Sequence, residues 1–155
     1  FEPRAEELAK KYALAPYTMF IGSGALWGET ILFSMCILEE MQWKRTRYIT
    51  SADFFHGTLE LVEPGVPVFL FMGEDENRKL DERARAFLTR GVTGDTDINI
   101  IDTAEFAIPG LDDEFRVIVS PWILSSLITD RLAAYYETVT KHNLNYRRYY
   151  HQFDY

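Results

Sequence analysis

Cysteine is almost absent from this sequence. Cys36 is the only one in 155 residues, so no disulfide can form within the chain. This shortage argues against an exported, disulfide-stabilised protein, and we expect a cytoplasmic one. Cys36 lies in the apolar run Ile31–Met41, where we expect a buried and unreactive thiol rather than a nucleophile.

Positive charge is scarce as well. Sixteen Lys and Arg against 24 Asp and Glu give a formal net charge of −8. An acidic surface repels nucleic acid and anionic lipid, so neither is an expected partner. An anionic small molecule remains possible, because a helix N-terminus or a local pair of arginines can bind a phosphate on an acidic protein.

Four further features are missing. No uninterrupted apolar run reaches the roughly 18 residues that a membrane span needs, and the start, Phe1–Arg4, is too polar for a signal peptide. No cluster of His, Cys, Asp and Glu has metal-ligand spacing, so we expect no metal. The chain also lacks an initiator Met, and we expect a piece of a longer protein.

Short apolar segments alternate with helical ones along the chain. Strands are expected at 17–21, 47–50, 66–72, 98–101 and 115–119, and helices at 6–12, 29–43, 74–91 and from Pro121 to about Lys141. This alternation predicts one α/β domain, a three-layer sandwich with a parallel sheet flanked by helices. The helix at 29–43 is apolar on nearly every face, so we expect it to be buried on more than one side. Residues 1–15 form a linker helix in this scheme, and residues 143–155 form a docking tail.

Gly22, Ser23 and Gly24 stand between a strand and a helix. Backbone N–H groups at such a turn can hold an anion with help from the helix dipole. The same residues also suit a tight turn with no ligand, and both interpretations stay open. A dinucleotide fingerprint is excluded, because the third glycine would fall at Trp27.

Two sites along the chain could carry acid–base chemistry. Glu39 and Glu40 come late in an apolar helix, where burial would raise a carboxyl pKa toward the range useful for proton transfer. If the helix frays there, both are ordinary solvated glutamates. His56 lies in a loop between aromatics and Gly57, and a loop histidine is either a natural acid–base group or simply a surface residue.

The C-terminal tail contains Arg147 and Arg148 between tyrosines. Such a pair could hold a substrate carboxylate or phosphate through charge-assisted hydrogen bonds. It could equally pin the tail to the domain or to a second subunit. The residues alone leave both readings open.

The segment Phe54–Pro67, with its His-Gly pair, resembles part of the second sugar isomerase (SIS) domain of glucosamine-6-phosphate synthase. It is still more similar to fructoselysine 6-phosphate deglycases and to their relatives that act on glucoselysine and fructose-asparagine phosphates. Asp75–Arg78 and Arg147–Tyr150 extend this likeness, which runs from about Tyr17 to the C-terminus. The resemblance implies a flavodoxin-like SIS domain, the second of a tandem pair whose N-terminal SIS domain is missing here.

In these families a catalytic glutamate precedes the loop histidine by about 16 residues, which selects Glu40 with His56. The resemblance implies a cofactor-free enzyme that cleaves a 6-phosphorylated sugar–amino acid conjugate, as a homodimer in which the two subunits share each active site. The substrate-binding residues expected on this basis are Gly22, Ser23, Gly24, Gly57, Arg147 and Arg148.

The sequence departs from the family pattern at two places. Thr58 follows His-Gly where many relatives have proline. Glu74–Glu76 occupies the position of a Ser/Thr-rich phosphate loop, and three carboxylates there would repel a phosphate. We therefore expect the phosphate to be bound by the first domain of the pair. An aldose–ketose or glucosamine-6-phosphate-type isomerase and a non-catalytic sugar-phosphate sensor remain alternatives.

Overall fold

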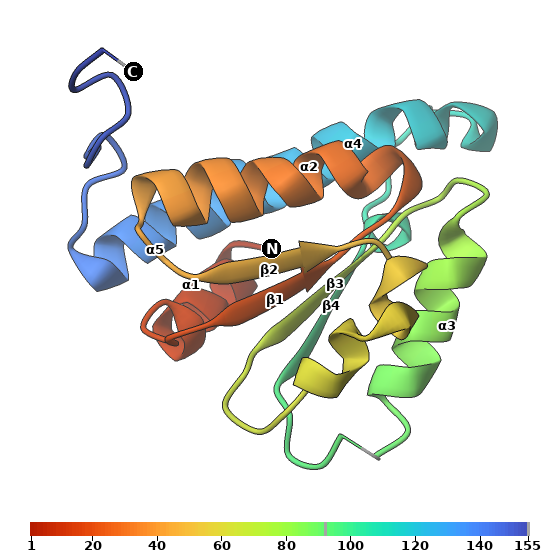
Figure 1. Ribbon diagram of the computed structural model, residues 1–155. Coiled ribbons are helices and arrows are strands. Elements are labelled where there is room, and N and C mark those ends of the chain that lie inside the picture. The colour runs from red at the N-terminus through yellow and green to blue at the C-terminus, as the bar shows by residue number, and fades with distance from the viewer. Residues whose placement is uncertain (92, 155) are drawn as a thin grey trace.

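A computed structural model describes residues 1–91 and 93–154 of the chain. Its sheet has four strands in the order β2-β1-β3-β4, and every neighbouring pair is parallel. This confirms the predicted parallel sheet (Figure 1). The strands are β1 (Thr18–Ile21), β2 (Thr46–Ile49), β3 (Val68–Met72) and β4 (Ile98–Asp102).

Helices cover both faces of the sheet, as the three-layer sandwich requires (Figure 1). One face carries α1 (Glu2–Tyr12), α2 (Trp27–Ile31) with its π-helical continuation η2 (Leu32–Met41), and the run α4 (Arg116–Ser125), η7 (Ser126–Leu132) and α5 (Ala133–Thr140). The other face carries α3 (Arg78–Leu88) and the 3-10 turns η3 (Asp53–His56) and η4 (Thr58–Leu61). The remaining 3-10 turns are η1 (Gly24–Leu26), η5 (Thr103–Glu105) and η6 (Asp113–Phe115).

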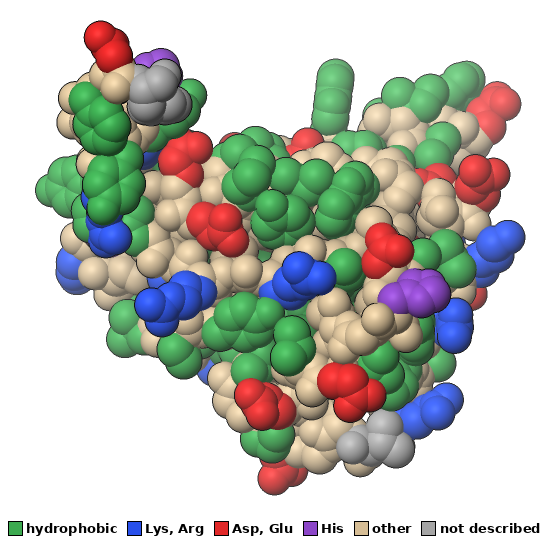
Figure 2. Space-filling view, viewed as in Figure 1, with side chains coloured by type: hydrophobic (Ala, Val, Ile, Leu, Met, Phe, Trp, Pro, Cys, Tyr) green, Lys and Arg blue, Asp and Glu red, His purple; other side chains and the backbone are tan. Residues whose placement is uncertain are grey.

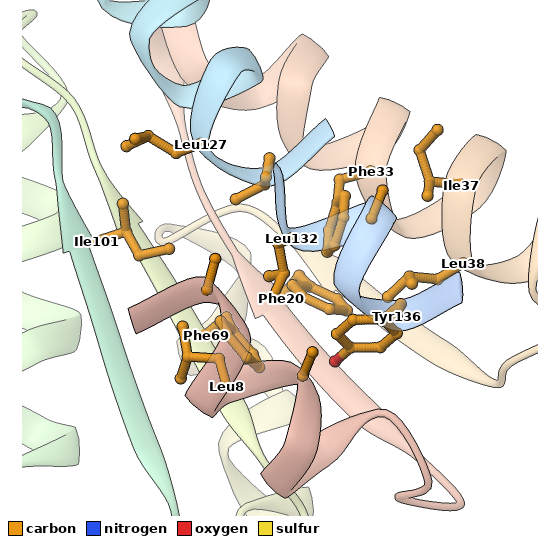
Figure 3. Packing of buried hydrophobic residues seen from close by; sticks show 14 of the residues in the cluster. Leu8, Phe20, Phe33, Ile37, Leu38, Phe69, Ile101, Leu127, Leu132 and Tyr136 are labelled. Carbon is orange, nitrogen blue, oxygen red and sulfur yellow. The ribbon is translucent and has the colours of Figure 1, made fainter. Parts of the chain in front are cut away.

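Alternation along the two central strands builds two cores. Phe20 of β1 and Phe69 of β3 stack at 5.2 Å between ring centroids and point toward α1, η2 and α5 (Figure 3). Met19 and Leu70, from the same strands, point to the opposite face and pack with α3. Both strands are completely buried, because side chains of period two face a helix layer on either side.

The expected strand at 115–119 is wrong, and so is a helix start at Pro121. Residues from Arg116 on are helical, and Pro121 lies inside α4. The Ser120 hydroxyl donates to the Val117 carbonyl at 3.1 Å, which supplies the partner that the missing N–H of Pro121 cannot. Asp113 and Glu114 begin this helix, and acidic side chains favour a helix N-terminus.

The helix α2–η2 is buried on one side only, contrary to expectation. Phe33, Ile37 and Leu38 pack into the core, whereas Met35 on the outward side is 41% exposed. Figure 2 shows hydrophobic side chains gathered along this helix on the molecular surface. The apolar pattern therefore exceeds what the domain itself buries, which is typical of a face that meets another protein surface.

The continuous helix Asp113–Thr140 is long and apolar enough to cross a membrane by length and composition, with 33% of its most apolar window buried in the fold. A core helix of a globular domain passes the same test. Here Leu124, Ile128, Leu132 and Tyr136 lie in the core beside α1 and the sheet.

A partly buried ion pair closes the carboxyl end of β4. Arg78 donates to both carboxylate oxygens of Asp102, at 2.9 and 2.6 Å. Burial acts to raise the pKa of Asp102, but hydrogen bonds from Arg78 and from the Ala104 N–H outweigh it and the pKa is lowered. A lowered carboxyl pKa means stabilisation that is present above the ordinary value of about 4 and is lost as the pH falls through the folded value.

We expect Asp102→Asn to lower the free energy of unfolding by about 1–3 kcal/mol at pH 7. The difference from wild type should shrink as the pH falls below about 4, because the wild-type carboxylate is then protonated as well. Urea unfolding at a series of pH values measures both the loss of stability at pH 7 and its change with pH. A difference that stays constant with pH would contradict the assigned role of the ion pair.

Candidate functional site

The sheet has a topological switch point between β1 and β3, where open α/β sheets commonly bind ligands beyond the carboxyl ends of the strands. The turn Gly22–Gly24 lies there, as predicted. The Asp75 carboxylate accepts the N–H of Ala25 at 2.5 Å and the N–H of Asn77 at 2.7 Å. Gly24 has a φ of +55°, and a Cβ at this position would meet the same carboxylate at 2.2 Å. The position that a bound anion would take is therefore occupied by a side chain of the protein.

The other residues of the turn also have partners inside the chain. Ser23 is buried, and its Oγ accepts the Ser51 N–H at 2.7 Å. The Ser51 hydroxyl donates to Asp81, whose second oxygen accepts the Gly73 N–H at 3.1 Å. Burial raises the pKa of Asp81 against the opposing effect of these two hydrogen bonds. This network ties the loops after β1, β2 and β3 to α3.

The acidic loop after β3 is used in the same way. The Glu74 carboxylate forms an ion pair with Arg116 and accepts the Thr103 hydroxyl at 2.8 Å. The Asp75 carboxylate accepts two backbone N–H groups here, and the Glu74 carboxylate pairs with Arg116 and Thr103. These donors are therefore already paired with carboxylates of the chain itself. This geometry supports the expectation that the phosphate is bound elsewhere, and substrate binding by Gly22, Ser23 and Gly24 stays a prediction.

A cavity of about 380 Å³ lies at the opposite end of the domain, where η2 meets the C-terminal tail. Figure 1 shows the tail rising beside the end of this helix and α5. The cavity contains Glu40, one of the two predicted catalytic residues, together with both tail arginines. Its lining consists of Glu39, Glu40, Trp43, Lys44, Arg147, Arg148, Tyr149 and Tyr150.

Glu40 is partly buried and paired. Its Oε1 lies 2.8 Å from Arg147 Nε, and the two side chains are 29% and 19% exposed. Arg147 Nη1 also donates to the carbonyls of Leu144 and Tyr146, so the guanidinium is held on three sides. Glu39 differs, because its Oε1 accepts the Thr46 hydroxyl at 2.6 Å beside the start of β2. The fraying helix that would leave both glutamates solvated is therefore not what the structure has.

The tail is pinned to the domain at several points. Arg148 lies over the ring of Trp43 at 4.3 Å, and the Trp43 ring meets that of His142 at 4.4 Å. Gln42 Nε2 donates to the His142 carbonyl at 2.6 Å. Of the two readings of the arginine pair, docking of the tail has direct contacts; Tyr155, its last residue, lies outside the described part. Substrate binding by Arg147 and Arg148 stays a prediction.

His56 is exposed at the end of η3. The turn beneath it is firmly packed: Phe54 is completely buried, and the Phe55 ring meets Phe87 at 5.9 Å. Gly57 follows with a φ of +142°, in the region that favours glycine, and with open space around its Cβ position. A rigid turn thus presents the imidazole outward from the domain.

Glu40 and His56 lie at different ends of this chain. The strands are parallel, so the helix α2–η2 returns across the sheet and places Glu40 just before β2 begins. The loop with His56 follows the end of β2. The cavity that contains Glu40 accordingly has no His56 in its lining. One copy of the domain does not assemble the predicted catalytic pair.

Sequence reasoning missed Trp43, Lys44, Tyr149 and Tyr150 as cavity residues. Only the tyrosine-rich tail carried a signal, since Lys44 lies in a segment without a motif. Cys36 is half-buried, and burial, with a smaller contribution from Glu40, raises the pKa of its thiol, which disfavours the reactive thiolate. Within residues 1–91 and 93–154, no group of three or more His, Cys, Asp or Glu is placed to hold a metal ion.

No family model matches the chain. It is 30% identical to the fructosamine deglycase of Bacillus subtilis over 94% of its own length and 43% of that protein. It is 31% identical to the fructoselysine 6-phosphate deglycase of Escherichia coli over 97% of its length and 42% of that protein. The chain thus spans less than half the length of these relatives.

A crystal structure from Bacillus subtilis, of a protein assigned as a phosphosugar isomerase, superposes with a TM-score of 0.90 at 28% identity. It covers 99% of this chain and 46% of that one. The same strand order and helix layers therefore recur in a sugar-phosphate protein about twice as long. Fold and sequence similarity together make this chain a sugar isomerase (SIS) domain, related to sugar–amine deglycases.

Proposed function

We propose that this chain is the second SIS domain of a deglycase. The whole enzyme cleaves a 6-phosphorylated sugar–amino acid conjugate of the fructoselysine or glucoselysine type to a hexose 6-phosphate and a free amino acid. The observation that carries the proposal is Glu40 in a half-enclosed cavity lined by acidic, basic and aromatic side chains, within a chain 30–31% identical to two named deglycases. Both relatives are named deglycases, and one of them is named for fructoselysine 6-phosphate, which suggests the substrate class. The cavity supplies a place for the chemistry.

Breaking a sugar–amine bond requires three steps. The ring must open, a proton must move between C1 and C2 to give a Schiff base, and water must add to the Schiff base carbon to give a carbinolamine, which expels the free amine and leaves a sugar carbonyl. We assign ring opening to His56 as the acid near the ring oxygen, and the proton shuttle to Glu40. Each such group contributes roughly 10²–10⁴ in rate. The substrate's own carbonyl acts as the electron sink, so the scheme uses no cofactor.

We further propose a homodimer whose active sites each take Glu40 from one subunit and His56 from the other. The separation of the two residues within one chain supports this arrangement. Exposed apolar side chains support it as well: Trp122 on α4 is 76% exposed and Ile118 is 68% exposed, besides Met35 on η2. Surfaces of this kind are typical of contacts with a second subunit or with the domain that completes the tandem pair.

The test uses the full-length protein with fructoselysine 6-phosphate and glucoselysine 6-phosphate. Free lysine and hexose 6-phosphate are followed together in the same samples. Stoichiometric release of both products from one conjugate would establish the deglycase and identify the sugar. Turnover of a sugar phosphate without lysine release would indicate an isomerase instead of a deglycase. Isomerase is the activity assigned to the superposed Bacillus subtilis protein. Binding with no turnover would favour the sensor.

A further inference from the structure

The cavity beside Glu40 is positively charged although the chain as a whole is acidic. Three basic side chains, Lys44, Arg147 and Arg148, face two acidic ones, Glu39 and Glu40. This local excess of one positive charge stands against a net charge of −8 for the chain. Excess positive charge in a half-enclosed space attracts an anion.

Two of these cations have no carboxylate partner among the residues that the structure describes. Arg147 pairs with Glu40, whereas the Arg148 guanidinium rests on the Trp43 ring and its hydrogen-bonding edge has no partner in the described chain. Lys44 is half-buried, and this burial lowers the pKa of its ammonium group. A partly desolvated ammonium group gains more from an added negative partner than an exposed one does.

The backbone that presents these cations is unusual. Trp43 has a φ of +53°, a conformation that is rare for a bulky residue. Packing against His142 and Arg148 keeps its ring in place between η2 and the tail. Strained residues of this kind persist where the surrounding structure holds them, and they cluster at ligand sites.

We propose that this cavity binds the carboxylate of the substrate's amino acid part, with Lys44 and Arg148 as its ionic partners. The inference rests on the proposed function and names a specificity site within it. The sugar carbon attached to nitrogen would then face Glu40, the cavity's proposed proton shuttle. A carboxylate site of this kind would favour amino acid conjugates over simple sugar amines.

The substrate's phosphate is a second anion that could use the same cations. Its binding here is disfavoured, because the cavity lies at the C-terminal end of η2, where the helix dipole repels negative charge. Glu39 and Glu40 add to this repulsion, which is greater for a dianion than for a carboxylate. One carboxylate would neutralise the single excess charge of the lining.

The experiment compares fructoselysine 6-phosphate with its lysinamide analogue, in which the carboxylate becomes a neutral amide. For the wild-type full-length enzyme we expect kcat/KM and affinity to fall about 10- to 100-fold with the amide, the range of a lost charge-assisted hydrogen bond. In Arg148→Gln this gap between the carboxylate and amide substrates should close, because the carboxylate substrate becomes as poor as the amide. Lys44→Gln should narrow the gap in the same direction.

Arg90→Gln is the matched control, since it removes one exposed arginine after α3, away from the cavity lining, and should leave the gap unchanged. A gap that persists in Arg148→Gln would overturn the inference. So would equal activity of wild type on both substrates, which leaves the proposed deglycase activity standing.

Titration with unphosphorylated fructoselysine separates the two anions: if Arg148→Gln weakens only phosphorylated ligands, the cavity binds phosphate and the inference fails. Affinity is measured beside turnover. If the protein binds the carboxylate ligand more tightly than the amide but releases no lysine, the proposed deglycase activity is wrong and the carboxylate site still stands.

Discussion

Glu40→Gln is expected to lower kcat of the full-length enzyme by about 10²–10⁴-fold on the phosphorylated sugar–amino acid conjugate. The amide is nearly the same size as the carboxylate, so it keeps a hydrogen-bond acceptor for Arg147, but it can neither take up nor return a proton. Steady-state release of lysine measures the loss. Solvent hydrogen exchange at the sugar C1 and C2 positions should disappear with it, which separates the proton shuttle from a defect in binding.

The neighbouring variant Glu39→Gln is the control for this prediction. Glu39 accepts a hydrogen bond from Thr46 and forms no ion pair with tail residues 143–154, so we expect its loss to cost less than about tenfold. Turnover above about a tenth of wild type in Glu40→Gln would show that another group moves the proton. A larger loss in Glu39→Gln than in Glu40→Gln would transfer the role to Glu39.

Mixing two inactive variants should restore activity. We expect Glu40→Gln and His56→Asn each to be nearly inactive alone, because every site lacks one of its two groups. In a dimer that contains one subunit of each kind, one site regains both groups and the other has neither. Random pairing therefore restores up to about a quarter of wild-type sites. Co-expression with two affinity tags and purification on both isolates the mixed dimer, in which up to about half of the sites are complete, and assay of this dimer measures the recovery.

The double variant Glu40→Gln/His56→Asn serves as the partner in the control, since its dimers with Glu40→Gln contain no complete site. Recovery there would indicate contamination by wild-type enzyme. Mixed dimers that form and stay inactive would mean that each subunit uses its own Glu40 and His56. This result would leave the reaction standing but require a large rearrangement within the subunit.

Local patterns in the sequence determined most of the fold. The segments at 17–21, 47–50, 66–72 and 98–101 all contain strands. The two central strands, β1 and β3, are completely buried, because short apolar runs bounded by turns have few other ways to bury both faces. The expected strand at 115–119 failed, since β-branched residues of such a short segment fit either structure. The buried positions Ser120, Leu124 and Ile128 continue at intervals of four, and that helical period decided the outcome.

For the candidate site, the sequence and the tertiary structure supplied different information. The sequence by itself singled out Glu40 and His56, through a spacing and a His-Gly loop shared with known enzymes. Tertiary structure alone decided that the two lie at opposite ends of the domain. The reason is that β1 and β2 are parallel, so the helix between them must run back across the sheet before β2 begins. It also decided that Asp75 fills the Gly-Ser-Gly turn and that Lys44, Arg147 and Arg148 meet around Glu40. Such contacts join residues up to about a hundred positions apart, and no local pattern encodes them.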